Sequence, residues 1–147
     1  MYRLERTLRP DEYRETFLKA KSQYMAEHPI PWDVHFREGK CTKPQLQGWA
    51  KDFYYWKQQV PIKDYGVLCG CPDLEIRRKW VLKAVEEDGE DIIGREHVPH
   101  PEYWLRFCEG VGLSRDYVIN AEPLPGVKFA VDHWTHTAAK SWLLGVA

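Results

Sequence analysis

Apolar residues recur every three or four positions along most of this chain, which is the spacing that places them on one face of an α-helix. The first such stripe follows Pro10 and runs to about Glu27, and a shorter one comes next. Thr42 opens the longest stripe, because a threonine followed three residues later by Gln45 is a capping box. We expect Pro61 to bend this helix without ending it. The stripe of the long helix carries Leu46, Trp49, Phe53, Trp56 and Val60.

The second half of the chain repeats this pattern with shorter segments. A helix is expected over residues 74–88, where Gly89 ends it, and another begins at Pro101 with His100 at or near its cap. Ser114 has the chemistry to cap a short helix that follows. The last predicted helix carries Val127, Val131, Trp134, Ala138 and Trp142 in phase.

No segment shows the sustained period-two alternation of a β-strand. There is also no internal repeat and no change of composition that would mark a second domain. The pattern therefore predicts an all-α helical bundle, with residues 1–147 forming a single domain.

Composition limits what this bundle can do. The chain has 147 residues, and its 21 Lys and Arg against 22 Asp and Glu leave a net charge of −1. Such a balance offers no excess positive field for nucleic acid or for an anionic membrane surface. No apolar run is long enough to cross a membrane, so we expect a cytoplasmic protein whose four cysteines stay thiols. Seven Trp, eight Tyr and five Phe must fill a core or line a pocket.

Glu87 is the most informative candidate for chemistry, because it lies in phase with Trp80 and Ala84 on the apolar stripe of its helix. A buried carboxylate needs a metal ion, a basic side chain or a raised pKa. The alternative is that the helix frays near Gly89 and turns Glu87 to solvent, and the pattern by itself favours that alternative.

Three histidine-containing groups are further candidates. His97 and His100 lie close to Glu87 in sequence, and one glutamate with one histidine suits iron, manganese or zinc but supplies too few ligands. Cys69 and Cys71 with these histidines lack the usual spacing of a zinc site. The third group lies on the last helix and consists of Asp132, His133 and His136. Two histidines three residues apart can bind a metal, but the threonines beside them favour a pair that faces solvent.

A series of motifs runs in order along nearly the whole chain, at residues 46–49, 53–55, 60–64, 71–73, 77–80, 104–106, 112–116 and 124–132. Together they resemble the pyrroloquinoline-quinone synthase (PqqC) family. The resemblance implies the haem-oxygenase-like, TenA-like helical bundle, whose wider relatives include non-haem di-iron oxidases.

The resemblance also implies roles for particular residues. Tyr24 and Lys63 match the synthase, whereas Met25 and Glu87 stand where the synthase has histidine. Three further residues replace other residues of the synthase site, namely Trp56, Lys57 and Lys83.

The di-iron relatives place a glutamate at the position of Glu87 and a histidine before the segment 104–106, which here is His100. The resemblance therefore implies Glu87 and His100 as iron ligands. On this reading, Tyr55 and Trp56 wall a substrate cavity, and Lys63 holds an anionic group.

The remaining iron ligands of those relatives follow the helix that begins at Pro125 and have no counterpart here. We therefore expect the N-terminal portion of the bundle. In its complete form it would be an oxygen-dependent di-iron oxidase of a small organic substrate.

Two alternatives stay open. The first is a metal-free, quinone-forming oxidase. The second is a non-catalytic binding or dimerisation module derived from this fold. Whichever function holds, we expect a homodimer, or a partner that covers the open half of the bundle.

Overall fold

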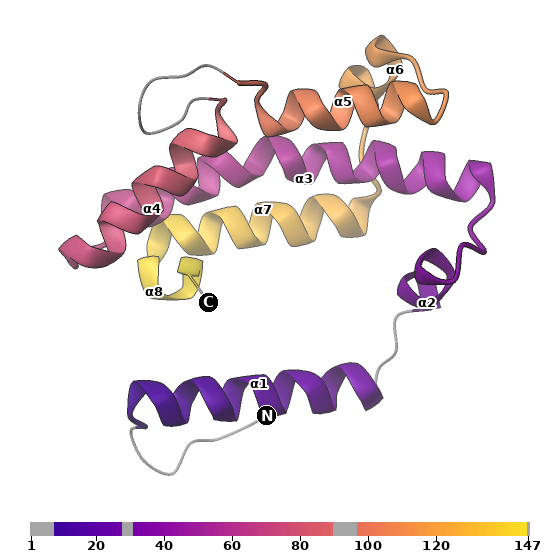
Figure 1. Cartoon of the computed structure of the whole chain (residues 1–147). Coiled ribbons are helices and arrows are strands. Elements are labelled where there is room, and N and C mark those ends of the chain that lie inside the picture. The colour runs from indigo at the N-terminus through magenta and orange to yellow at the C-terminus, as the bar shows by residue number, and fades with distance from the viewer. Residues whose placement is uncertain (1–7, 28–30, 90–96, 147) are drawn as a thin grey trace. The chain divides into compact units, whose positions relative to one another are not determined.

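The computed structural model describes residues 8–27, 31–89 and 97–146, and every element among them is helical (Figure 1). The described residues contain no strand, so the all-α prediction is confirmed. None of the described helices is both long and apolar enough to span a membrane. In chain order the helices are α1 Pro10–Glu27, α2 Pro31–Arg37, α3 Lys43–Gly70, α4 Leu74–Glu87, α5 His100–Gly110, α6 Arg115–Asn120, α7 Pro125–Lys140 and α8 Trp142–Val146.

The chain separates into two compact units, residues 1–41 and residues 42–147. The first unit holds α1 and α2, where the rings of Tyr13 and Phe17 stack with centroids 6.2 Å apart. The second unit holds the other helices. The single domain predicted over 1–147 stays a prediction.

Helix α3 is the central element of the second unit. Helices α4, α5, α7 and α8 all pack on it, and α6 packs on α5. Figure 1 shows α3 running between α5 on one side and α7 on the other. The N-terminal half of α3 builds an apolar cluster with α5 and α6, formed by Ala50, Tyr54, Leu105, Cys108 and Val118. Burial there raises the pKa of the Cys108 thiol to about 11.

The predicted helix starts are confirmed at three positions. Gln45 Oε1 accepts hydrogen bonds from the backbone N–H and the hydroxyl of Thr42, both at 2.9 Å. The carboxylate of Asp73 accepts from the N–H of Ile76 at 3.0 Å, and the hydroxyl of Ser114 caps α6 in the same way. Each of these helices begins where a polar side chain hydrogen-bonds a residue less than one helical turn away in sequence.

Gly89 is the stop predicted after α4, and its φ of 93° lies in the left-handed region. A side chain there would also collide, because a Cβ would lie 2.6 Å from the carbonyl oxygen of His97. That approach matches the hydrogen bond from the His97 N–H to the Gly89 oxygen at 2.9 Å. The contact brings the chain back beside the end of α4 just before α5 begins.

The last helix differs from the prediction, which carried one stripe through to Trp142. Helix α7 ends at Lys140, and Ser141 is extended with φ −148° and ψ 108°. The break lets α8 fold back onto α3 and α7. Gly145 is buried there, and a Cβ at this position would lie 2.5 Å from Val67 and 2.8 Å from the Cβ of Ala138. Tertiary packing has overridden the local helical stripe.

This close approach predicts that Gly145→Ala destabilises the second unit by about 1–3 kcal/mol, because the added methyl group overpacks the contact. Urea unfolding followed by tryptophan fluorescence measures the change. Gly126→Ala is the matched control, since a Cβ there meets nothing within 4 Å. Equal unfolding midpoints for the two variants would contradict the packing described for α8.

Candidate functional site

Glu87 is buried at the end of α4, with 8% of its surface exposed. Its Oε2 lies 2.6 Å from His100 Nδ1, and its Oε1 lies 3.6 Å from the Nζ of Lys83, one turn earlier on α4. The pattern-based expectation that Glu87 turns to solvent is therefore wrong. A basic side chain and an imidazole together supply the partners that a buried carboxylate requires.

Asp64 on α3 is the other carboxylate of this site and is fully buried. Its Oδ1 lies 2.5 Å from Lys63 Nζ and accepts a hydrogen bond from the indole N–H of Trp80 at 3.0 Å. Its Oδ2 accepts from the ammonium group of Lys83. Three donors from α3 and α4 thus converge on one carboxylate, which offsets the desolvation of its charge.

Lys63 is 5% exposed and is surrounded by aromatic rings. Its Nζ lies 4.9 Å from the ring centroid of Trp80 and 4.8 Å from that of Trp134 on α7. It also reaches the carbonyl oxygen of Gly145 in α8 at 3.5 Å. The ammonium group is therefore held by cation–π contacts and by Asp64.

The helical repeat explains how α4 supplies its part of the site. Trp80, Lys83 and Glu87 follow one another at intervals of three and four residues, which places them on the face that meets α3. His100 is the first residue of α5, and the Gly89–His97 contact returns the chain to this place. The site thus joins α3, α4 and the start of α5.

The charges of the site balance. Two ammonium groups, Lys63 and Lys83, face the carboxylates of Asp64 and Glu87. The lysines differ in access, because the side chain of Lys63 is 6% exposed and that of Lys83 is 41% exposed. Lys83 is thus the positive group that a molecule from solvent can reach.

The contact between Glu87 and His100 has a chemical consequence. With Nδ1 engaged by the carboxylate, the second ring nitrogen of His100 is the one that can exchange a proton with another molecule. In many enzymes a carboxylate orients a histidine that acts as a general base. Histidines that bind a metal ion are often oriented by a carboxylate in the same way.

Glu87 and His100 have the donor types that iron accepts, but they supply only two ligands. The part of the chain that the structure describes holds no group of three or more His, Cys, Asp or Glu side chains able to hold a metal ion. Lys83 also places a positive charge beside Glu87. The described residues therefore do not form a complete di-iron site.

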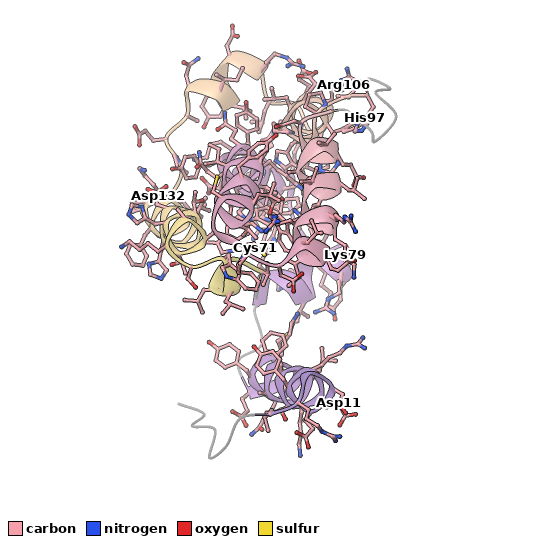
Figure 2. The ribbon with its side chains drawn as sticks, turned by 90° about the vertical axis from the view of Figure 1, so that its left-hand side faces the viewer. Asp11, Cys71, Lys79, His97, Arg106 and Asp132 are labelled. Atoms are coloured by element: carbon pink, nitrogen blue, oxygen red, sulfur yellow. The ribbon has the colours of Figure 1, made fainter. Side chains whose placement is uncertain are left out.

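Tyr55 lies in a different cluster from Lys63. Its hydroxyl donates to Asp132 on α7, and the Nζ of Lys128 lies 2.6 Å from the other oxygen of that carboxylate. The hydrogen bond to Asp132 raises the pKa of Tyr55, and the ammonium group of Lys128 lowers that of Asp132. Tyr55 and Lys128 line a hollow of about 280 Å³ between α3, α6 and α7. Figure 2 labels Asp132 on the side of α7 that faces outward.

Trp56 packs between Phe53 and Trp134, with ring centroids at 4.5 Å and 6.0 Å. Through Trp134 it joins the aromatic surroundings of Lys63. Tyr24 lies on α1 in the first unit and is 64% exposed. The substrate-binding roles given to Tyr24, Tyr55, Trp56 and Lys63 stay predictions.

The other histidine groups do not add ligands to this site. Cys69 is exposed and Cys71 is buried, and neither joins His97 or His100 in a metal-binding group among the described residues. On α7 both histidines, His133 and His136, are exposed, as the sequence led us to expect.

The sequence pattern overlooked Asp64, Trp80 and Trp134 as parts of the site. A signal existed for Trp80, because it precedes Glu87 by two helical turns on the same stripe. No comparable signal marked Asp64, because an aspartate next to a lysine within a helix is normally expected to be exposed to solvent.

Because three donors depend on Asp64, we predict that Asp64→Asn lowers the free energy of unfolding by about 3–5 kcal/mol, the usual cost of leaving buried charges without their partner. Chemical denaturation measures this loss. The control is Asp132→Asn, which removes a carboxylate from a solvent-exposed ion pair and should cost less than about 1 kcal/mol. Similar losses for both variants would contradict the central role of Asp64.

Residues 14–147 match the TENA/THI-4/PQQC family. The chain is 39% identical over 138 residues to a pyrroloquinoline-quinone synthase from Cronobacter sakazakii, covering 93% of this chain and 53% of that protein. It is 37% identical over 139 residues to the synthase from Acinetobacter baumannii, with 92% and 52% covered. For the synthase from Pseudomonas aeruginosa the identity is 38% over 130 residues, with 87% and 50% covered.

The chain thus spans about half the length of the curated relatives it matches. Its all-α architecture agrees with the haem-oxygenase-like bundle that the sequence motifs imply. This protein belongs to the TENA/THI-4/PQQC family.

Proposed function

We propose that this chain forms part of an oxygen-dependent oxidoreductase related to the pyrroloquinoline-quinone synthases, in which Glu87 and His100 act as an acid–base pair on a small organic substrate. The observation that carries the proposal is the 2.6 Å contact between Glu87 Oε2 and His100 Nδ1. The similarity to pyrroloquinoline-quinone synthases over most of the chain supports the reaction class.

The chemistry assigned to His100 is proton transfer. Oxidation of a substrate by molecular oxygen removes two electrons and two protons, and the oxygen becomes hydrogen peroxide. A base at the reacting carbon must accept a proton before the electron pair can leave. His100 fits this role because its imidazole is fixed by Glu87, while about a third of its side chain remains exposed.

Lys83 is the group proposed to hold a negative charge on the substrate. It lies on the same face of α4 as Glu87, and an anion beside it would be close to His100. Lys63 is linked to Lys83 through Asp64, because both ammonium groups bind the carboxylate of that residue. Lys63 is too enclosed for an anionic ligand to reach, so such a ligand would bind Lys83. It would have to compete there with the carboxylates of Asp64 and Glu87.

We predict that pyrroloquinoline quinone, used as a carboxylated probe, binds the 147-residue chain and quenches its tryptophan fluorescence, because Trp80 lies beside Lys83. Lys83→Met and His100→Gln should each weaken binding about tenfold, by removing an ionic or a charge-assisted contact. The matched controls on α7 are Lys140→Met and His133→Gln, both at exposed positions, which should leave the affinity unchanged. Absence of binding, or equal weakening by the controls, would contradict the proposal.

A di-iron oxidase is the second candidate, and the specific observation in its favour is that a carboxylate oxygen and an imidazole nitrogen from adjacent helices approach each other directly. If iron were held there, it would supply the redox chemistry. The described residues supply too few ligands to complete such a site.

Iron analysis separates the two candidates. For a metal-free acid–base pair, we expect the same low iron content in the wild-type chain and in Glu87→Ala after equilibration with Fe²⁺ and removal of excess metal. Lys140→Ala serves as a control for a change in surface charge. Stoichiometric iron that disappears in Glu87→Ala would overturn the metal-free reading and support the di-iron candidate.

A further inference from the structure

The hollow of about 280 Å³ between α3, α6 and α7 is a second cavity of the second unit. Figure 1 shows the connection between α6 and α7 passing across α3. Neither Glu87 nor His100 is among the described residues that line this hollow. Its wall on α3 comes from one side of that helix, because the residues are spaced by three or four positions. They are Lys51, Tyr54, Tyr55 and Gln58.

Hydrogen bonds from α3 hold the opposite wall of the hollow in place. The Nζ of Lys51 donates to the carbonyl oxygen of Glu122 at 3.0 Å. The Oδ1 of Asp52 accepts from the backbone N–H of Leu124 at 3.1 Å, and it also lies 2.9 Å from the Nζ of Lys51. These contacts tie the connection between α6 and α7 to α3, so the shape of the hollow is set by the fold.

The hollow contains hydrogen-bond donors that the described residues leave without an acceptor. Tyr54 is 7% exposed, and its hydroxyl oxygen accepts from Gln58 Nε2 at 3.1 Å, but no described group accepts the hydroxyl proton. Burial raises the pKa of Tyr54, so this proton is retained at neutral pH. The ammonium group of Lys51 has three N–H bonds, of which Asp52 and Glu122 take two. A bound molecule with acceptor oxygens would satisfy both donors.

Lys128 adds a third donor from α7. Its Nζ lies 2.6 Å from Asp132 Oδ2, and half of its side chain is exposed. An ion pair this exposed contributes little, so a ligand can compete for Lys128. Both ammonium groups of the hollow are nevertheless paired with a carboxylate, Asp52 for Lys51 and Asp132 for Lys128, so little net charge remains. This balance favours a monoanion over a phosphate dianion.

The remaining wall of the hollow is apolar, and the volume is at the small end of the range for ligand sites. The apolar lining residues are Val118, Ile119, Ala121 and Pro123. We propose that this hollow binds a small organic monocarboxylate with an apolar body. The carboxylate accepts hydrogen bonds from Lys51 and Tyr54 and is attracted by the ammonium group of Lys128, while the body packs against the apolar residues.

The test uses benzoate as the probe, followed in two-dimensional nitrogen–proton NMR spectra of the 147-residue chain. Benzoate should shift the backbone amide signals of residues 51–58 and 118–124 in a saturable way. Tyr54→Phe removes only the hydroxyl group, and Lys128→Met removes an exposed charge. Each should raise the dissociation constant about tenfold. Benzyl alcohol, which has the ring but no charge, should bind at least about tenfold more weakly than benzoate.

Three control variants should leave the benzoate affinity of the hollow unchanged. Tyr65→Phe removes a hydroxyl group from an exposed position of α3, and Lys140→Met removes an ammonium group from an exposed position of α7. Lys83→Met removes the ammonium group beside Glu87 and so separates this hollow from the site described above. The same NMR spectra show whether each variant keeps its fold.

Four results would overturn the proposal. The first is a binding curve that shows no saturation by about 20 mM benzoate, a limit that follows from the small size of the probe. The second is a set of shifts confined to the surroundings of Lys83, and the third is equal weakening by Tyr54→Phe and Tyr65→Phe. The fourth is benzyl alcohol that binds as tightly as benzoate, because the charge of the ligand would then play no part. If Tyr54→Phe fails to fold, Lys128→Met against Lys140→Met decides the outcome.

Discussion

The burial of Asp64 is the constraint on which the second half of α3 depends. A carboxylate without access to water must have its charge and its lone pairs satisfied by the protein. Here Trp80 and Lys83 of α4 satisfy it from one side and Lys63 from within α3. Lys63 in turn contacts Trp134 of α7 and the backbone of α8. The partners that Asp64 requires therefore help to determine which faces of α4, α7 and α8 pack against α3, directly for α4 and through Lys63 for α7 and α8.

The sequence was sufficient for those parts of the fold that depend on near neighbours. The starts of α3, α4 and α6 follow from capping residues within one turn, and the end of α4 follows from a glycine with positive φ. The break between α7 and α8 could not be predicted in this way. It depends on the fit of Gly145 against Val67, which is distant in sequence.

The same distinction explains the site. The apolar stripe placed Glu87 toward the core, but its partners decided whether it could remain there. Lys83, four residues earlier, was visible in the sequence, whereas His100 lies beside Glu87 through a contact distant in sequence, where the His97 N–H donates to the Gly89 oxygen. The closeness of His100 to Glu87 in sequence and the motif resemblance both marked this histidine as a candidate, and hydrophobic periodicity did not.

Charge balance links two residues that the sequence treated separately. The resemblance places histidine in the synthase where this chain has Glu87, and Lys83 also stands where the synthase has another residue. A buried carboxylate in place of an imidazole adds a negative charge, and the ammonium group of Lys83 offsets it at 3.6 Å. Glu87 and Lys83 are therefore best understood as a coupled pair. Because this pair leaves the site with two positive and two negative groups, a bound anion gains less from it than from a site with uncompensated lysines.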